Sequence, residues 1–409
     1  MKEVRTIILG FLISASLAPA AQWLETTSLP DAYYWHSLVY ASGFLYNAGG
    51  SSSINGDIDG SHVFYASVHE DGTIGPWNPT SPIPQPTLHH ASVAANGFVY
   101  ILAGYHFSVQ TGDVLTNTVY RARINQDGTL APWQVANPIP FSAYGLGASV
   151  WNNRIYVVGG QNDDVGPTNA VYSAVILSDG TLSAWIAQTP APIRIAAHAQ
   201  AVNSMLYIIG GSTGRSGSQL NGKVYYSAIN PDGTLAGWET NALPQPLTDL
   251  GSIAARGQVL IVGGWSGSTS VNNYYSAAAD GDGALGPWSP GPSLPTALYV
   301  FGMAVSDSHI FITGGANSAG AQKSVRSVAL PPAPPVPTLR AQVVASNRAF
   351  QINLASTSNT GFGLSASTDL VNWANIGWGF TDTNGSLALR DTNAASFPQR
   401  FYRAYWPLP

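Results

Sequence analysis

The sequence predicts an all-β protein in which six similar four-stranded sheets form a closed ring, followed by a small second β-domain. Three observations lead to this prediction. A hydrophobic run ending in glycine recurs six times, a tryptophan recurs in register with it, and the first and last copies of the repeat are incomplete in complementary ways. Because a single four-stranded sheet has exposed edges and little core of its own, the sheets are expected to pack face to face around an axis.

The glycine runs are expected to be the second strand of each sheet. They lie at 45–50, 99–104, 155–160, 206–211, 259–264 and 310–315, and each is rich in β-branched and aromatic residues. Five of them end in Gly-Gly, whereas the second has Ala103 in the first glycine position. Glycine at the end of a strand permits neighbouring backbones to approach where a Cβ would intrude. The pair therefore predicts close contact between adjacent sheets.

Six tryptophans recur at intervals close to the period of about 50 residues that is typical of propeller blades. They are Trp23, Trp77, Trp133, Trp185, Trp238 and Trp288. In five units an aromatic residue precedes the tryptophan at a constant distance, and an Asp-Gly pair lies between them. Asp-Gly accepts the backbone of a tight hairpin and so predicts the turn between the third and fourth strands. In the fourth unit we expect strands at 198–202, 205–209, 223–229 and 235–239.

The two ends of the repeat region complete each other. Trp23 has no glycine run before it, and the run at 310–315 has no tryptophan after it. Segment 22–25 is therefore predicted to be the outermost strand of the blade whose other three strands lie at about 300–330. This pairing would close the ring.

Residues 21–330 resemble the six-bladed kelch propellers of the galactose oxidase/kelch-like superfamily, whose repeat has a glycine pair followed by a spaced tyrosine and tryptophan. The resemblance implies a six-bladed kelch-like β-propeller. It implies little about activity, because that superfamily includes galactose oxidase, sugar-acid epimerases and pure binding scaffolds.

The segments outside the repeats predict a secreted two-domain chain. Residues 1–20 have Lys2 and Arg5 before an apolar stretch and end in Ala18-Pro19-Ala20, the pattern of a signal peptide, and no other segment is long enough to span a membrane. Residues 331–338 form a proline-rich linker. Residues 339–409 predict a small β-sandwich-like domain, with strands at 349–354, 363–366, 386–389 and 400–405, and resemble C-terminal domains of secreted bacterial proteins.

Composition excludes several functions. A net charge of −5 and a pI near 5.8 leave no basic stripe for nucleic acid. The chain has no cysteine, so it has no disulfides, no thiolate metal site and no Tyr-Cys copper cofactor of the galactose oxidase type. We expect a monomer.

Function is predicted at one face of the ring. The loops between strands two and three share a face with the loops that lead into the next blade, and they bring aromatic, histidine, arginine and aspartate side chains to the channel mouth. Aromatic rings stack on the C–H faces of sugars, and charged or polar side chains bind sugar hydroxyls or a carboxylate. This combination predicts binding of a carbohydrate or a surface protein. Adjacent side chains of an extended segment point to opposite faces, so at most one of His89 and His90 is expected to reach the axis. The candidate ligand-binding residues are Trp35, His36, His90, Tyr144, Arg194, His198, Asp249, Trp265 and Tyr299.

Two alternatives stay open. One is a carbohydrate-active enzyme such as a sugar-acid epimerase or mutarotase, with a histidine as acid or base and Arg194 as the clamp for a carboxylate; it would require a converging acid–base pair with perturbed pKa values. The other is a structural display scaffold, whose mouth would be blocked by apolar side chains. Neither a catalytic residue nor a metal or cofactor is nominated. Four histidines expected at the mouth are interpreted as channel lining: His36, His89, His90 and His198. Residues 55–60 match half of a calcium-binding loop, but Ala66 stands where that loop needs glutamate.

Overall fold

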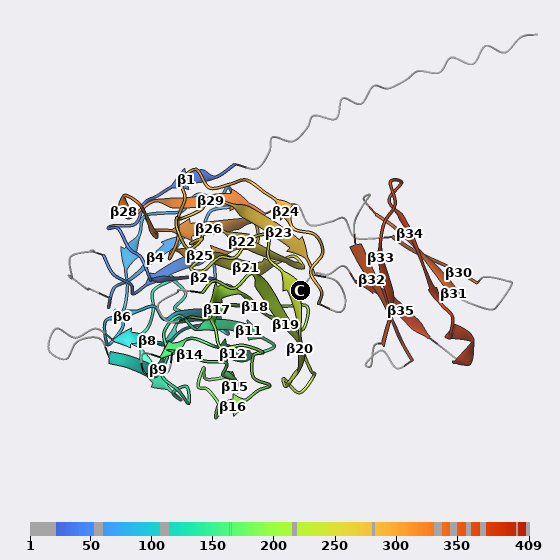
Figure 1. Cartoon of the computed structure of the whole chain (residues 1–409), viewed down its shortest axis with the longest axis horizontal. Coiled ribbons are helices and arrows are strands. Elements are labelled where there is room, and N and C mark those ends of the chain that lie inside the picture. Colours follow the sequence, from blue (N-terminus) through green and yellow to red (C-terminus); the bar gives the residue numbers. More distant parts are fainter. Residues whose placement is uncertain are drawn as a thin grey trace, which may run out of the picture.

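The computed structural model describes residues 22–405 except 53–59, 107–113, 163, 165, 215–218, 280–282, 331–337, 344–349, 357–360, 369–373 and 398–399. In this part of the chain the elements are β-strands, apart from one short 3₁₀ turn at Ala394–Ser396. The predicted signal peptide and most of the predicted linker lie outside the described residues. Figure 1 shows the strands grouped as blades around a ring, with a separate pair of sheets formed by the C-terminal residues.

Six antiparallel sheets form the blades, each with its strands in order from the axis outward. Blade one contains β2 (Ser37–Ala41), β3 (Phe44–Ala48), β4 (Val63–Ser67) and β5 (Asn78–Pro79). Blade two contains β7 (Ala91–Ala95), β8 (Phe98–His106), β9 (Val114–Arg123) and β10 (Gln134–Ala136), with β6 (Thr87–Leu88) added to β8. Blade three contains β11 (Gly147–Trp151), β12 (Arg154–Val158), β15 (Val171–Val175) and β16 (Ile186–Ala187).

The later blades follow the same plan. Blade four contains β17 (Ala196–Val202), β18 (Met205–Ser212), β19 (Lys223–Ile229) and β20 (Leu235–Ala242), close to the strands expected from the sequence. Blade five contains β21 (Gly251–Ala255), β22 (Gln258–Val262), β23 (Tyr274–Ala278) and β24 (Ser289–Pro290). Two small ribbons extend from blades three and six: β13 (Gln161–Asn162) with β14 (Gly166–Pro167), and β27 (Ala316–Asn317) with β28 (Gly320–Ala321).

Blade six closes the ring with both ends of the repeat region. Its strands are β25 (Gly302–Val305), β26 (His309–Thr313), β29 (Val325–Ala329) and β1 (Leu24–Thr26). Leu24 pairs with Ser327 and Thr26 with Val325, which places β1 beside β29 in Figure 1. The first strands contact one another in the circular order β2, β7, β11, β17, β21, β25 and again β2. The predicted closure of a six-bladed propeller by the N-terminal strand is confirmed.

The glycine pair joins each blade to the next. The N–H of the second glycine donates to a carbonyl that precedes the next blade's first strand, at 2.8 to 2.9 Å. The second position has φ between 86° and 108°, which favours glycine, whereas the first lies between 55° and 63°, a region that Ala103 also adopts at 56°. Ala103 therefore adopts the backbone of the first position in blade two, whereas the second position is glycine in all six blades. The six bonds are Gly50 to Thr87, Gly104 to Ala143, Gly160 to Ile195, Gly211 to Leu247, Gly264 to Leu298 and Gly315 to Tyr33.

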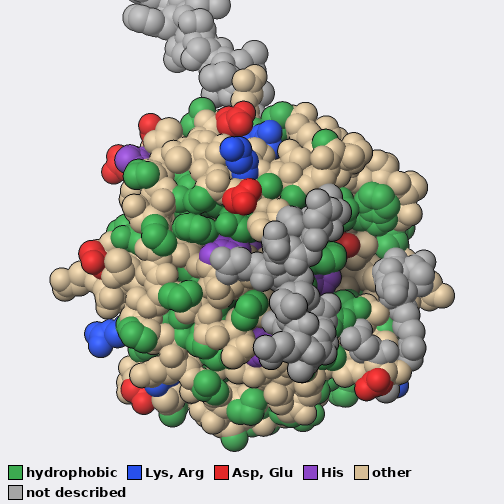
Figure 2. All heavy atoms as spheres, turned by 90° about the vertical axis from the view of Figure 1, so that its left-hand side faces the viewer, with side chains coloured by type: hydrophobic (Ala, Val, Ile, Leu, Met, Phe, Trp, Pro, Cys, Tyr) green, Lys and Arg blue, Asp and Glu red, His purple; other side chains and the backbone are tan. Residues whose placement is uncertain are grey.

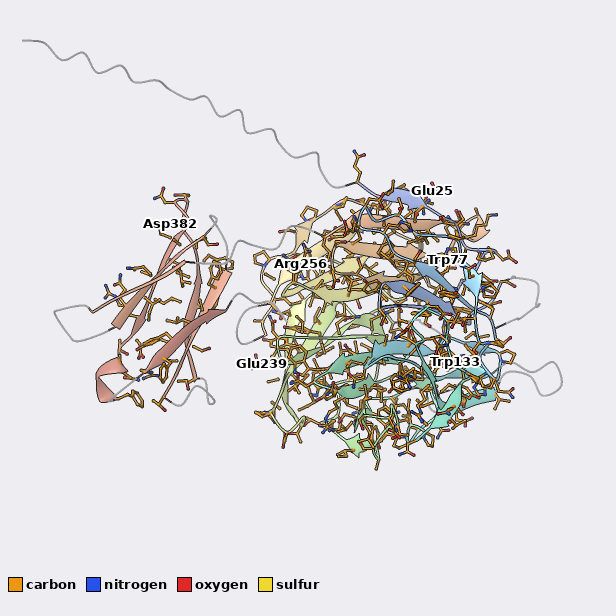
Figure 3. The ribbon with its side chains drawn as sticks, turned by 180° about the vertical axis from the view of Figure 1, so that it is seen from behind. Glu25, Trp77, Trp133, Glu239, Arg256 and Asp382 are labelled. Atoms are coloured by element: carbon orange, nitrogen blue, oxygen red, sulfur yellow. The ribbon has the colours of Figure 1, made fainter. Side chains whose placement is uncertain are left out.

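The repeated tryptophan is a second link between blades. Each indole Nε1–H donates to a backbone carbonyl at or just after the end of the outer strand of the preceding blade, at 2.7 to 3.1 Å. Figure 3 labels two of these residues, Trp77 and Trp133, at the periphery of the propeller. These half-buried indoles each bond to the preceding blade, so the spacing of the tryptophans follows the spacing of the blades.

Hydrophobic side chains fill the space between neighbouring blades. Among the described residues they form six clusters, and each cluster joins two adjacent blades. The tyrosines of the second strands add a polar contact, because Tyr46 and Tyr207 donate their hydroxyls to carbonyls of the Asp-Gly turns in the next blade, Gly128 and Gly283. The core of this protein is thus a ring of interfaces.

The C-terminal domain contains two three-stranded sheets. One consists of β30 (Thr338–Val343), β31 (Phe350–Ala355) and β34 (Ser386–Asp391), and the other of β33 (Ala374–Phe380), β32 (Gly361–Ser367) and β35 (Phe401–Tyr405). The sequence predicted four of these strands and missed β30 and β33. The last residue of the predicted linker, Thr338, is already paired with Ala355.

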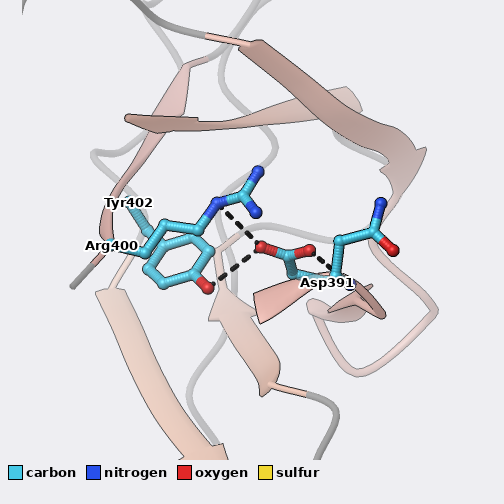
Figure 4. Close-up of polar contacts among 4 residues, drawn as sticks. Asp391, Arg400 and Tyr402 are labelled. Atoms are coloured by element: carbon cyan, nitrogen blue, oxygen red, sulfur yellow. Dashed lines mark hydrogen bonds and ion pairs between the residues drawn. The ribbon is translucent and has the colours of Figure 1, made fainter. Parts of the chain in front are cut away.

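An ion pair connects β34 to the segment around β35 (Figure 4). Arg400 Nε lies 3.1 Å from Asp391 Oδ2, and the Tyr402 hydroxyl donates to the same oxygen at 3.0 Å. Burial and the neighbouring Asp391 raise the pKa of Tyr402 to about 12. The arginine and tyrosine of the C-terminal sequence therefore have a structural role within the domain.

Candidate functional site

A cavity of about 500 Å³ lies where the loops that lead into the first strands of all six blades meet. Seven of the nine predicted residues line it: Trp35, His36, His90, Tyr144, His198, Asp249 and Tyr299. Figure 2 shows histidine side chains gathered toward the centre of one face of the propeller. The assignment of loops to a common mouth therefore brings together residues from six distant parts of the chain.

The other two predicted residues do not line the cavity. Arg194 is exposed, and Trp265 is half-buried and packs on the lining residue Tyr299, with 5.2 Å between the ring centroids. Asp163 and Arg215, two charged residues of the loops between second and third strands, lie outside the described residues, as does the calcium-like segment except Gly60.

The expectation for His89 and His90 is wrong, because both line the cavity. His89 has φ 55°, in the left-handed region, so the chain here is not extended and its side chains do not alternate between faces. Sequence reasoning missed His89 for this reason. The signal it lacked was the backbone conformation.

Aromatic rings form one side of the mouth. The Trp35 and His89 rings are 4.3 Å apart and nearly perpendicular, and His89 continues to Tyr144 at 5.4 Å. Tyr144 in turn packs on Tyr105 at 4.6 Å. This arc of rings, which we call the aromatic arc, comprises Trp35, His89, Tyr144 and Tyr105 and spans blades one to three.

The opposite side, from blades four and five, is polar. His198 and Asp249 line it together with Ser212 and Thr248. Burial raises the pKa of Asp249 to about 6 and lowers the pKa of His198 to about 4. At neutral pH the wall therefore presents a carboxylate and a neutral imidazole. We call these four residues the polar arc.

His36 and His90 lie deeper, between blades. His36 Nε2 accepts from the Gly302 N–H at 3.2 Å and lies 3.0 Å from the Thr313 hydroxyl, while His90 Nε2 lies 2.8 Å from the Ser37 hydroxyl. Burial, followed by repulsion from neighbouring histidines, lowers the pKa of both to about 3. Both imidazoles are neutral hydrogen-bonding links between blades.

The lining residues include no lysine or arginine, so the Asp249 carboxylate is the charged group of the wall. Among the residues that the structure describes, no three histidine or carboxylate side chains are placed to bind a metal ion. The arrangement can stack a ring and bind uncharged polar groups.

Comparison with known proteins gives consistent results. No family model matches the sequence. Kelch-like protein 36 of Mus musculus is 24% identical over 285 residues, which cover 68% of this chain and 43% of that protein. Beta-scruin of Limulus polyphemus is 23% identical over 209 residues, covering 50% of this chain and 22% of that protein. The chain thus spans less than half the length of the curated relatives it matches.

A solved structure shares the fold. The structure of YjhT matches with a TM-score of 0.58 and 14% identity over 80% of this chain and 99% of that chain. The repeats, the six blades and these matches together define a kelch-repeat β-propeller. Such a propeller supports a role in binding or as a scaffold. In the described part of the chain, no helix is long and apolar enough to cross a membrane.

Proposed function

We propose that this protein binds a carbohydrate in the axial cavity. The observation that supports this most directly is that the aromatic arc and the polar arc line the same cavity. Pyranose rings present C–H faces that stack on aromatic side chains and a rim of hydroxyls that need hydrogen bonds. The two arcs offer both kinds of contact to one ligand.

The size and charge of the cavity limit which carbohydrates it can bind. A volume of about 500 Å³ falls within the range of small-molecule sites, about 300 to 1,000 Å³, and accommodates one or two sugar rings. A sugar acid would bring a negative charge toward the Asp249 carboxylate with no cation among the lining residues to balance it. A neutral sugar is therefore favoured over a sugar acid.

Glycan-array screening followed by titration calorimetry tests the site. Trp35→Ala should weaken binding by about tenfold or more, because it removes an aromatic ring that lines the cavity. Arg194→Ala should change the affinity by no more than about twofold, since an exposed side chain outside the cavity contributes little. Binding that survives Trp35→Ala unchanged would discard this face. Capture of a surface protein without sugar binding would favour the protein-partner alternative.

Affinity should also depend on pH through Asp249. Its carboxylate accepts a sugar hydroxyl in the ionised form, and with the pKa near 6 about one tenth remains ionised at pH 5. Binding is therefore expected to weaken by about tenfold between pH 7 and pH 5. Asp249→Asn should remove this dependence, and calorimetry at both pH values checks it. An equal loss in wild type and variant would exclude Asp249 as the titrating group.

A second candidate function is a carbohydrate-active enzyme, such as an epimerase or mutarotase. The observation that favours it is that His198 and Asp249, both with shifted pKa values, line the same cavity. Exchange NMR of the sugar found by screening distinguishes the two. Accelerated anomer exchange that Asp249→Asn abolishes would establish the enzyme, and an unchanged exchange rate leaves binding.

Secretion and a monomeric state are part of the proposal. They are supported by the signal-peptide pattern of residues 1–20 and by the internal closure of the ring. N-terminal sequencing of the mature protein should begin at Ala21, and light scattering should give one chain per particle. Retention of Met1 or a dimer would contradict these expectations.

A further inference from the structure

A chain of backbone hydrogen bonds surrounds most of the cavity. Trp35 N–H donates to Val300 O at 3.1 Å, and His89 N–H donates to Trp35 O at 3.0 Å. Gly145 N–H donates to His89 O at 2.9 Å, and Val300 N–H donates to Asp249 O at 3.1 Å. These five residues, from blades five, six, one, two and three, all line the cavity and all have φ between 51° and 59°. We call this chain of residues the belt.

The belt is open at blade four. The equivalent residue there is Ala197, which lies in β17 without a positive φ, at a point where the pairing of β17 with β18 shifts register. Within the described residues, no hydrogen bond reaches the carbonyl oxygen of Gly145 or the N–H of Asp249. One acceptor and one donor are thus left on the two sides of the same gap.

Small side chains flank the gap. The residue before the belt position is large or branched in the other five blades but is Ala196 in blade four. Ala196, Ala197 and both belt ends line the cavity, so the gap opens into it. The corresponding residues elsewhere are Tyr34, Leu88, Tyr144, Thr248 and Tyr299.

We propose that the gap in blade four binds the acetamido group of an N-acetylated sugar, whose N–H donates to the Gly145 carbonyl and whose carbonyl accepts from the Asp249 N–H. This rests on the proposed carbohydrate binding and names the substrate class. A trans secondary amide presents one donor and one acceptor in opposite directions, as the missing belt residue would. The alanine methyl groups offer the acetyl methyl an apolar surface.

The chemistry of the gap discriminates among related sugars. A buried polar group left without a partner costs about 1 to 3 kcal/mol, so a ligand that satisfies both belt ends gains over one that satisfies neither. An ammonium has no acceptor, and an ester has no N–H donor. Glucosamine and 2-O-acetylglucose should therefore each form one fewer hydrogen bond than the amide. Glucose has no acetamido group and should leave the gap unfilled.

Titration calorimetry with four probes tests the proposal. N-acetylglucosamine is expected to bind at least about tenfold more tightly than glucose, glucosamine or 2-O-acetylglucose. Equal affinity for glucose and N-acetylglucosamine would overturn the amide site while leaving carbohydrate binding intact. Binding of 2-O-acetylglucose as tight as the amide would also overturn it. Failure of all four probes, with no sugar retained on a glycan array, would reject both proposals.

A variant that fills the gap tests its location. Ala196→Tyr installs the residue type that three other blades carry at this position, and it should remove the advantage of N-acetylglucosamine over glucose, so that the two affinities agree within about twofold. Val135→Ala, at a side chain 68% exposed on the outer strand of blade two, should leave both affinities unchanged. A folded Ala196→Tyr protein that still prefers the amide contradicts the assignment. If that variant misfolds, two other measurements test the location of the amide site. One is the same comparison with Ala196→Thr, which copies Thr248 of blade five, and the other is the four-probe comparison on the wild type.

Discussion

Gly50→Ala is expected to destabilise the propeller by about 3 to 4 kcal/mol, whereas Gly43→Ala in the same blade should cost about 1 kcal/mol. The two glycines have nearly the same backbone, with φ 87° and 85°. A Cβ at Gly50 would lie 2.7 Å from the backbone of Tyr34 and His36, while a Cβ at Gly43 meets nothing within 4 Å. The backbone strain that alanine introduces is therefore the same at both positions. The difference between the two destabilisation energies measures the close contact between the end of blade one's second strand and the loop at the mouth.

Thermal unfolding followed by circular dichroism measures this difference. For a propeller of about 300 residues the unfolding entropy is about 0.6 kcal/mol/K, so each kcal/mol lowers the melting temperature by about 1.6 °C, and Gly50→Ala should melt about 3 to 5 °C below Gly43→Ala. The shift should be accompanied by loss of the Gly50 to Thr87 hydrogen bond, which joins blades one and two. Equal melting temperatures would show that the close approach at the second glycine does not limit stability.

The second large effect is loss of stability in acid. His36 and His90 have pKa values near 3 in the folded protein and 6.5 in the unfolded chain, so between these values the unfolded state binds protons that the folded state cannot. Their contribution is complete above pH 6.5 and declines as the pH falls. Between pH 7 and pH 5 each histidine should lower the free energy of unfolding by about 2 kcal/mol, and the two together by about 4 kcal/mol. Asp249, whose pKa is raised, acts in the opposite direction and offsets part of this loss.

Urea unfolding at pH 7 and pH 5 tests the histidines. In the double variant His36→Gln, His90→Gln the difference in unfolding free energy between the two pH values should shrink by about 4 kcal/mol relative to wild type. His69→Gln is the control, because His69 is exposed and follows the end of β4 that lies away from the mouth. A double variant with the wild-type pH dependence would mean that other groups govern acid unfolding.

The blades were predictable because backbone requirements fix their signals. The second glycine of each pair needs a φ that other residues rarely adopt, and the indole N–H needs a carbonyl at a constant distance in the preceding blade. Both demands recur once per blade, so they appear in the sequence as a period. The closing strand followed from the same repeat, because Trp23 bonds to Pro292 as its counterparts bond to their neighbours.

The details of the mouth were less predictable because they depend on irregular backbone. Left-handed residues such as His89 redirect the side chains that follow, and no alternation rule for extended chains applies there. Arg194 was placed at the mouth by its loop, but its side chain is exposed and does not line the cavity. Comparing the repeats position by position would have revealed Ala196 as the small residue of its column, but not the open hydrogen bonds beside it.

The pairing of β1 with β29 also sets an order of events during biosynthesis. The first strand of the ring emerges from the ribosome about 300 residues before its partner, so its hydrogen-bonding edge has no native neighbour until the last blade is made. Five blades can assemble as they appear, but the sixth must wait for a contact of very long sequence separation, whose loop-closure entropy slows folding. Among the six blades, the one that closes the ring is therefore expected to form last.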